Sequence, residues 1–274
     1  MSKNTPASIC TDGGHRLFVR DWGTGRPVVL LAGWGTDSRL WAESMIGLNA
    51  AGLRTVSYDR RGHGLSSDPG RYDYDALADD LARVLETLDL RDVTLVTHSG
   101  AVGEAVRYAT RYGLERISRM VWVAATGPHV LQTADDAEGF VSPAMLEAQL
   151  ERLSYDVGRW IDENIEPFAP GAPKRVLDWL SQMVLNTSRR GLIDFQRAIA
   201  EADFRSDAMK LELPITLIHG DRDVSAPIEA CAYRWLALLP DAELVRYDGV
   251  AHGVMVTHGK RLATDIARCV ERRE

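Results

Sequence analysis

Short apolar runs alternate along this chain with longer amphipathic segments, and this alternation restricts the possible folds more than any other feature. Within the segment 74–88, for example, Leu77, Leu81, Leu85 and Leu88 recur at the spacing of one helix face. Strands that alternate with helices of this length are typical of an α/β protein with a mostly parallel sheet and helices on both faces. The apolar runs that we interpret as buried strands are 28–31, 55–58, 93–96, 120–123, 215–218 and 244–247, and the predicted helices are 74–88, 100–112, 228–239 and 259–274.

The stretch 128–205 departs from this alternation. It contains no convincing strand, and its helical patterns cover 144–153, 157–165, 176–185 and 192–202. These patterns are punctuated by prolines, namely Pro143, Pro167, Pro170 and Pro173. We predict a helical cap, inserted between two strands of the sheet, that shapes a substrate pocket. The α/β core then consists of 1–127 and 206–274.

The charge and the cysteines argue against several classes of function. The 274 residues carry a net charge of −7, so we expect neither nucleic acid nor an anionic membrane surface as a partner. The cysteines lie far apart without a CxxC pattern, so neither a metal site nor a disulfide framework is expected, and no cofactor motif is present. Residues 1–14 lack the apolar run of a signal peptide, and no stretch approaches the roughly 18 apolar residues of a membrane span. We therefore expect a cytoplasmic protein.

A serine stands where an apolar run passes directly into a helical pattern. This residue, Ser99, lies within LVTHSGA at 95–101. A strand–serine–helix turn of this kind, a nucleophile elbow, exposes the hydroxyl above the sheet. The residues two before and two after the serine must be small, and here they are Thr97 and Ala101 instead of glycines. A serine in this position can also simply cap the helix that follows.

A serine hydroxyl needs a base before it acts as a nucleophile, and a suitable histidine follows later in the chain. His252 comes just after the last apolar run, and HGDRD at 219–223 comes just after the run before it. Both lie at carboxyl ends of predicted parallel strands, where such sheets bind ligands. Ser99, an aspartate and His252 are thus in the chain order that this elbow requires. The pattern leaves open whether Asp221 or Asp223 orients the histidine.

Two backbone N–H groups are candidates for an oxyanion hole. One belongs to Gly100, directly after the serine, and the other belongs to Trp34 in AGWG at 32–35. Glycines on both sides of Trp34 allow the backbone to approach a ligand closely. Each such donor is typically worth about 10²–10³ in rate.

Taken together, these motifs resemble the non-haem haloperoxidases of the α/β-hydrolase superfamily, a group that includes aryl esterases and perhydrolases. The matching segments are AGWG at 32–35, YDRRGHG at 58–64, HSGAVGEAVRY at 98–108, HGDRDVSAPIEA at 219–230 and AHGVMVTH at 251–258. The resemblance implies the α/β-hydrolase fold, with Ser99 as nucleophile, His252 as base, and Asp223 rather than Asp221 as the acid. It also implies hydrolysis of small carboxylic esters or lactones through an acyl-enzyme, without metal or cofactor. Some members of the group also pass the acyl group to hydrogen peroxide.

This chain departs from the pattern of the group at positions near the expected site. Ala32 stands where a histidine is usual, and Thr97 and Ala101 replace the elbow glycines. Gly35 stands where members that favour perhydrolysis often carry a proline. The last difference favours ordinary ester or lactone hydrolysis over perhydrolysis.

Other functions are built on the same scaffold and stay open as alternatives. Cofactor-free oxygenases of this fold carry their acid after the strand that follows the nucleophile helix, but here the segment 123–127 reads VAATG. A specialised biosynthetic lyase or cyclase, or a non-hydrolytic binder of small molecules, keeps similar residues around the serine. Labelling of Ser99 by a serine-reactive phosphonate distinguishes a hydrolase from a binder. The sequence contains no signal for an oligomeric state.

Overall fold

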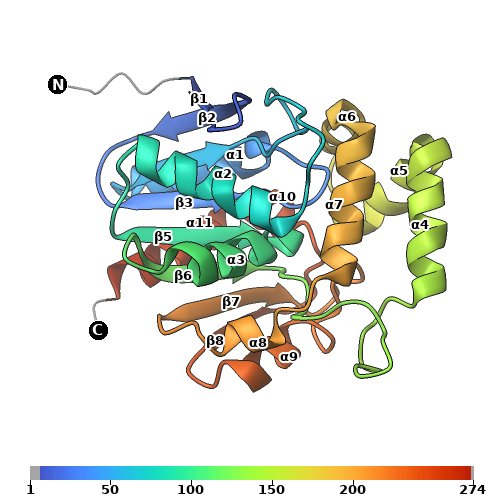
Figure 1. Cartoon of the computed structure of the whole chain (residues 1–274). Coiled ribbons are helices and arrows are strands. Elements are labelled where there is room, and N and C mark those ends of the chain that lie inside the picture. The colour runs from blue at the N-terminus through green and yellow to red at the C-terminus, as the bar shows by residue number, and fades with distance from the viewer. Residues whose placement is uncertain (1–6, 273–274) are drawn as a thin grey trace.

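The computed structural model describes residues 7–272, and its centre is an eight-stranded sheet (Figure 1). The strands lie in the order β1-β2-β4-β3-β5-β6-β7-β8. The pairs from β4 to β8 are parallel, whereas β2 pairs antiparallel with both β1 and β4. The strands are β1 (Ser8–Cys10), β2 (Arg16–Trp22), β3 (Pro27–Leu31), β4 (Arg54–Tyr58), β5 (Val93–His98), β6 (Ile117–Val123), β7 (Ile215–Gly220) and β8 (Glu243–Tyr247).

Helices cover both faces of the sheet, which explains the continuous apolar runs. In β3, Val29 and Leu31 belong to the same apolar cluster as residues of α2 and α3, whereas Val28 and Leu30 pack with residues of α1 and α11. Successive side chains of a strand point to opposite faces, so a strand covered on both sides is apolar at every position. The core helices are α1 (Ala42–Ala50), α2 (Tyr74–Thr87), α3 (Val102–Tyr112), α8 (Arg205–Ala208), α9 (Ala232–Leu238), α10 (Val254–Thr257) and α11 (Gly259–Glu271), with short 3₁₀ turns η1 (Ser38–Trp41) and η2 (Ser99–Ala101).

The α/β prediction is confirmed, and each apolar run predicted as a strand lies within one of β3 to β8. The prediction omitted β1, β2, α1 and the short helices α8 and α10. In β2 only alternate residues such as Leu17 and Val19 are buried, so this strand lacks the continuous apolar run. Helix α9 begins at Ala232 rather than at 228, because residues 228–231 form a turn in which the N–H groups of Ala230 and Cys231 donate to the Pro227 carbonyl. Parts of the predictions for 1–14 and 259–274 lie outside the described residues.

Four helices between β6 and β7 stand together beyond the carboxyl ends of the parallel strands (Figure 1). They are α4 (Pro143–Tyr155), α5 (Val157–Phe168), α6 (Lys174–Asn186) and α7 (Arg189–Glu201), and they coincide with the predicted helical patterns. Helix α4 packs against α7 and α5, and α5 packs against α6. We call α4–α7 the cap, and the division of the chain at 128 and 205 stays a prediction.

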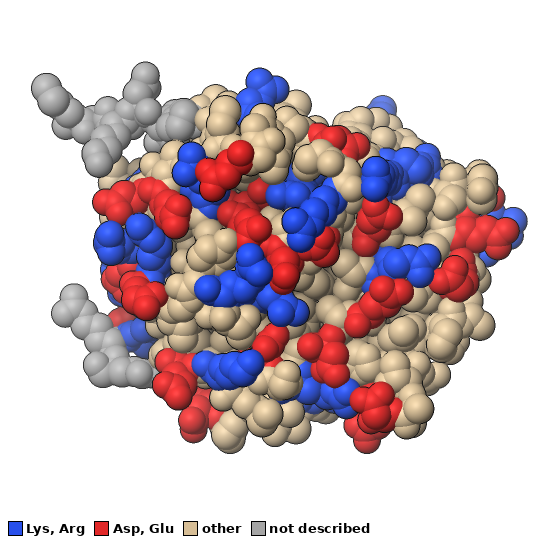
Figure 2. Space-filling model, in the orientation of Figure 1, with Lys and Arg blue, Asp and Glu red and all other residues tan. Residues whose placement is uncertain are grey.

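Charged side chains of both signs are interspersed on the face of the molecule seen in Figure 2. On this face no broad region of one sign appears, although the chain as a whole carries a net charge of −7. Among the residues that the structure describes, no helix has the length and apolar character needed to cross a membrane.

Candidate active site

Ser99 lies at the turn between β5 and the helix that follows it, as the sequence predicts for a nucleophile elbow. Its φ angle is 55°, a left-handed conformation that costs a non-glycine residue about 1–3 kcal/mol. Thr97 and Ala101 on either side are fully buried. The backbone of Gly33 comes so close that an added Cβ would lie 3.2 Å from the Ser99 Cβ atom. The tight packing explains why only small residues fit around this turn.

The histidine and one aspartate meet at the ends of β7 and β8. The Nδ1 atom of His252 lies 2.7 Å from the Oδ2 atom of Asp223, and both side chains are buried. The other carboxylate oxygen of Asp223 accepts the N–H groups of Ser225 and Ala226 at 2.9 and 2.8 Å. Burial alone would raise the pKa of Asp223, but His252 and His219 lower that pKa well below its usual value. The carboxylate therefore stays ionised beside the imidazole.

Asp221, the competing carboxylate, points elsewhere. It accepts hydrogen bonds from the Arg246 guanidinium at 2.7 Å and from the Gly249 N–H at 2.6 Å. These contacts lower the pKa of Asp221 and brace the loop that leads from β8 to His252. The structure therefore brings Asp223, and not Asp221, to the histidine.

The loop after β3 carries Trp34, whose N–H is a candidate oxyanion donor. The indole Nε1–H of Trp34 donates to the Leu192 carbonyl of α7 at 2.8 Å, and its ring packs edge-on against Trp160 of α5 at 4.7 Å. Gly35 has a φ of 65°, which the next turn of this loop requires. Helices of the cap thus hold the loop from one side.

From the other side, the same loop is held by a buried ion pair that we did not recognise in the sequence. Arg60 donates to the carbonyls of Ala32 at 2.6 Å and Gly33 at 3.2 Å, and also to the Glu104 carboxylate of α3. Its guanidinium lies 4.4 Å from the centroid of the Phe195 ring in α7. Burial raises the pKa of Glu104 to about 6, although Arg60 opposes the rise. The available signal was an arginine two residues after a buried strand, in YDRRGHG at 58–64.

His98 is a second group whose place the sequence did not reveal. Its ring centroid lies 4.7 Å from that of His252, and its Nε2 atom lies 3.3 Å from the His252 carbonyl oxygen. Burial, together with the neighbouring His252, lowers the pKa of His98 well below its usual value. A neutral His98 therefore packs against the histidine of the candidate site and also contributes to the cavity lining.

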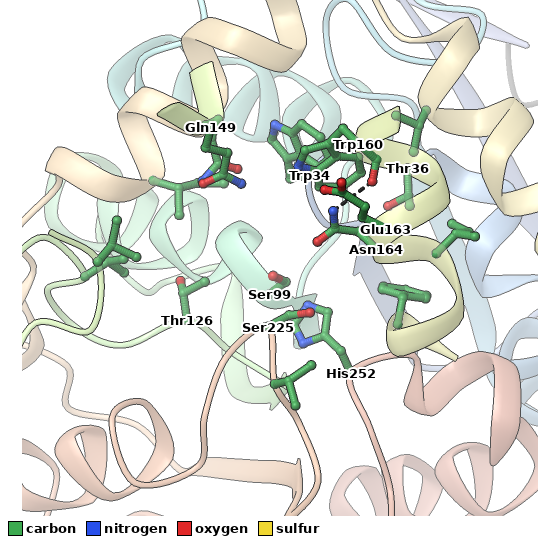
Figure 3. A pocket seen from close by; sticks show the side chains of 18 of the residues that line it. Trp34, Thr36, Ser99, Thr126, Gln149, Trp160, Glu163, Asn164, Ser225 and His252 are labelled. Atoms are coloured by element: carbon green, nitrogen blue, oxygen red, sulfur yellow. Dashed lines mark hydrogen bonds between the residues drawn. The ribbon is translucent and has the colours of Figure 1, made fainter. Parts of the chain in front are cut away.

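A cavity of about 630 Å³ lies between the cap and the carboxyl edge of the sheet, and Ser99 and His252 form part of its lining. Figure 3 shows the two side chains next to each other at one end, with Trp34 and Trp160 on one side and Gln149 on another. The apolar lining also includes Val130, Ile165, Phe168, Leu180, Val184 and Ile199. Among residues 7–272, no group of His, Cys, Asp and Glu side chains is arranged to hold a metal ion.

Known proteins that resemble this chain have the same fold and similar sequences over most of its length. The model of the alpha/beta hydrolase family matches residues 28–265. A non-heme chloroperoxidase from Kitasatospora aureofaciens is 33% identical over 260 residues, which cover 92% of this chain and 94% of that protein. A bromoperoxidase structure from Bacillus anthracis has a TM-score of 0.92 at 30% identity and covers 97% of this chain and 99% of its own. An esterase structure from Exiguobacterium antarcticum has a TM-score of 0.93 at 25% identity, with 98% and 100% covered.

The resemblance predicted from the motifs is thereby confirmed at the level of the family. The matched segment runs from β3 to α11 and includes Ser99, Asp223 and His252. The chain belongs to the alpha/beta hydrolase family and is related to non-heme haloperoxidases and esterases.

Proposed function

We propose that this protein is a serine hydrolase that cleaves small carboxylic esters or lactones through an acyl-enzyme. Ser99 is the nucleophile, His252 the general base and Asp223 the acid that orients the histidine. The observation that carries the proposal is the 2.7 Å contact between His252 and the buried Asp223, at a cavity that Ser99 also lines. A hydroxyl, an imidazole and an ionised carboxylate in this relation activate a serine.

In the first half of the reaction, the Ser99 Oγ atom attacks the carbonyl carbon of the ester. Because Asp223 holds the Nδ1 side of His252, the Nε2 atom is free to accept the hydroxyl proton. The N–H groups of Trp34 and Gly100 stabilise the negative charge that develops on the carbonyl oxygen. His252 then returns the proton to the leaving alkoxide, which departs as an alcohol, or stays attached to the acyl group when the substrate is a lactone.

In the second half, water releases the acyl group. His252 accepts a proton from water, the resulting hydroxide attacks the acyl carbon, and the proton returns to Ser99. Hydrogen peroxide in place of water gives a peracid by the same steps. The similarity to a non-heme chloroperoxidase favours this perhydrolase side activity.

The alternatives to ester hydrolysis use the same scaffold for another reaction or for binding alone. A cofactor-free oxygenase with its acid after β6 is disfavoured, because Ala124, Ala125 and Thr126 follow that strand. A biosynthetic lyase or cyclase, or a small-molecule binder, would leave the Ser99 hydroxyl unreactive towards esters.

The test is hydrolysis of short-chain aryl esters and lactones by the wild type and by Ser99→Ala, side by side. We expect the variant to lose on the order of 10⁶ in kcat, because these residues act as a unit. We also expect a fluorophosphonate to label the wild type at Ser99 and to leave the variant unlabelled. Unchanged hydrolysis in a folded Ser99→Ala protein, or an unlabelled wild type without activity on any ester, contradicts the proposal.

A further inference from the structure

The cap supplies two glutamine side chains to the cavity, and neither has a use in the proposed chemistry. Gln149 lies on α4 and Gln196 on α7, two helices that pack against each other. Both side chains are half-buried, and within residues 7–272 neither carboxamide has a hydrogen-bond partner. A carboxamide offers one acceptor oxygen and two donor hydrogens. Two of them at one cavity wall therefore form a neutral surface that can both donate and accept hydrogen bonds.

A third amide lies across the cavity from Gln149 in Figure 3. Asn164 of α5 donates through Nδ2 to the Trp160 carbonyl at 2.7 Å, and its side-chain oxygen has no partner among the described residues. The cap thus lines the cavity with amide groups from α4, α5 and α7.

The two charged side chains that line this wall form an ion pair with each other. Arg152 of α4 pairs with Glu163 of α5 across the helix boundary, and Arg159 also donates to Glu163, at 3.0 Å. Within the described part of the chain, the residues that line the cavity include one arginine, Arg152, one glutamate, Glu163, and no lysine or aspartate. The wall therefore has no unpaired charge that would favour an ionic substrate.

Apolar side chains lie next to the reacting groups. The Phe168 ring centroid lies 5.5 Å from that of His252, and Ile199 lies against the backbone of Gly100, the residue after Ser99. Both side chains line the cavity. A ligand that fills this space needs an apolar segment next to its carbonyl and a neutral hydrogen-bonding group farther away.

We propose that the substrate is an ester or lactone with an uncharged hydrogen-bonding group, a carboxamide or a hydroxyl, separated from the reacting carbonyl by an apolar spacer. Gln149 and Gln196 bind this group, and Asn164 faces it from across the cavity. The inference rests on the proposed hydrolase activity, because it assigns the substrate class of that same site.

The experiment compares synthetic esters that match in shape and differ in polarity. In the acyl series, p-nitrophenyl 5-carbamoylpentanoate is compared with p-nitrophenyl 6-methylheptanoate, whose isopropyl end has the shape of the amide, and with the adipic acid monoester, which is anionic. In the alcohol series, the acetate of 6-hydroxyhexanamide is compared with the acetate of 6-methylheptan-1-ol. Shorter and longer spacers in each series cover differences in reach.

We expect kcat/KM for the amide to exceed that for its isopropyl match by about tenfold in one of the series, as two added hydrogen bonds allow. The double variant Gln149→Leu/Gln196→Leu should bring this ratio close to one. The matched control is Gln182→Leu on α6, an exposed glutamine outside the cavity lining, which should keep the ratio of the wild type.

Equal or lower kcat/KM for the amides in both series, or a ratio that survives the double variant, overturns the inference. A preference for the anionic ester over the amide also overturns it, because Arg152 would then act as an unpaired cation. Hydrolysis of the isopropyl esters that depends on Ser99 tests the proposed function separately, so failure of the substrate class and failure of the hydrolase are told apart.

Discussion

The carboxyl edge of the sheet and the cap meet at one cavity, but they hold their side chains in different ways. At the sheet edge, Asp223 is buried and receives two backbone N–H groups in addition to His252. On the cap, Gln149 and Gln196 are half-buried and have no partner among the described residues.

This difference separates two tasks in one cavity. Groups at the sheet edge are fixed by the register of parallel strands and by short loops, which suits a reaction that needs defined geometry. Groups on the cap are fixed by the packing of amphipathic helices, and their polar ends are available to a ligand. In our proposal, the sheet edge therefore sets the chemistry and the cap sets the substrate.

The largest effect should come from the acid at the sheet edge. Asp223→Asn should lower kcat by about 10⁴, because the amide no longer holds His252 in the tautomer that accepts the serine proton. Asp221→Asn should change kcat by less than about tenfold, because Asp221 contacts Arg246 and Gly249 instead. Steady-state kinetics on one aryl ester measures both. Similar losses of kcat in the two variants would contradict the assignment of Asp223, rather than Asp221, as the acid that orients His252.

A second prediction concerns the charge buried beneath the Trp34 loop. Burial raises the pKa of Glu104 from 4.5 to about 6. A carboxyl whose folded-state pKa is raised stabilises the fold below its unfolded pKa and loses that contribution as the pH rises through the folded pKa. As the pH rises from about 4 to about 7, the wild type should therefore lose about 2 kcal/mol of unfolding free energy relative to Glu104→Gln.

Denaturant unfolding of both proteins across this pH range measures the difference. The sign follows from the cost of burying the Glu104 charge, which exceeds what Arg60 returns. If the wild type instead became more stable relative to Glu104→Gln as the pH rises, the attraction between Arg60 and Glu104 would exceed the cost of burying the Glu104 charge.

The backbone strain at the serine provides a third test. Ser99→Gly should be more stable than Ser99→Ala by about 1 kcal/mol, because glycine adopts a φ of 55° without the clash of a Cβ atom. Both variants lack the hydroxyl and should be equally inactive, so the comparison rests on their unfolding free energies. The expected difference is the relief of strain minus the larger unfolded-state entropy of glycine. Equal stabilities would mean that the left-handed conformation at residue 99 costs no more than that entropy.

The smallest effect should appear on the cap. Ser142 caps α4 by accepting the Met145 N–H at 3.2 Å, and Ser142→Ala should cost about 0.5 kcal/mol. Hydrogen exchange should show faster opening of α4 and unchanged exchange in α3, if the cap opens without the core. Equal acceleration in both helices would show that cap and core unfold as one unit.

The sequence was most informative where one physical requirement determines the residues. Strands covered on both faces must be apolar throughout, so β3 to β8 could be found, while β2, with alternate residues such as Leu17 and Val19 buried, was missed. The tight turn at Ser99 needs small neighbours, so the elbow was also recognisable. The choice of Asp223 over Asp221 came from family resemblance, since it depends on how the loop after β7 turns.

Sequence patterns did not predict the contacts between separate helices, strands and loops. The Arg60 contacts with Ala32, Gly33 and Glu104 join segments far apart in the chain. The pairing of Arg152 with Glu163 depends on how α4 meets α5. Helical spacing predicts which residues share a face of a helix, but it does not determine which neighbour that face meets.

The cap occupies a single interval of the chain, after β6 and before β7, while Ser99 follows β5 and His252 follows β8. An insertion at this point can lengthen, shorten or be exchanged between related genes without altering the strand register that positions the serine and the histidine. If the proposed division of labour holds, new substrates can arise in descendants of this protein through drift in α4–α7, while the reaction itself is inherited unchanged.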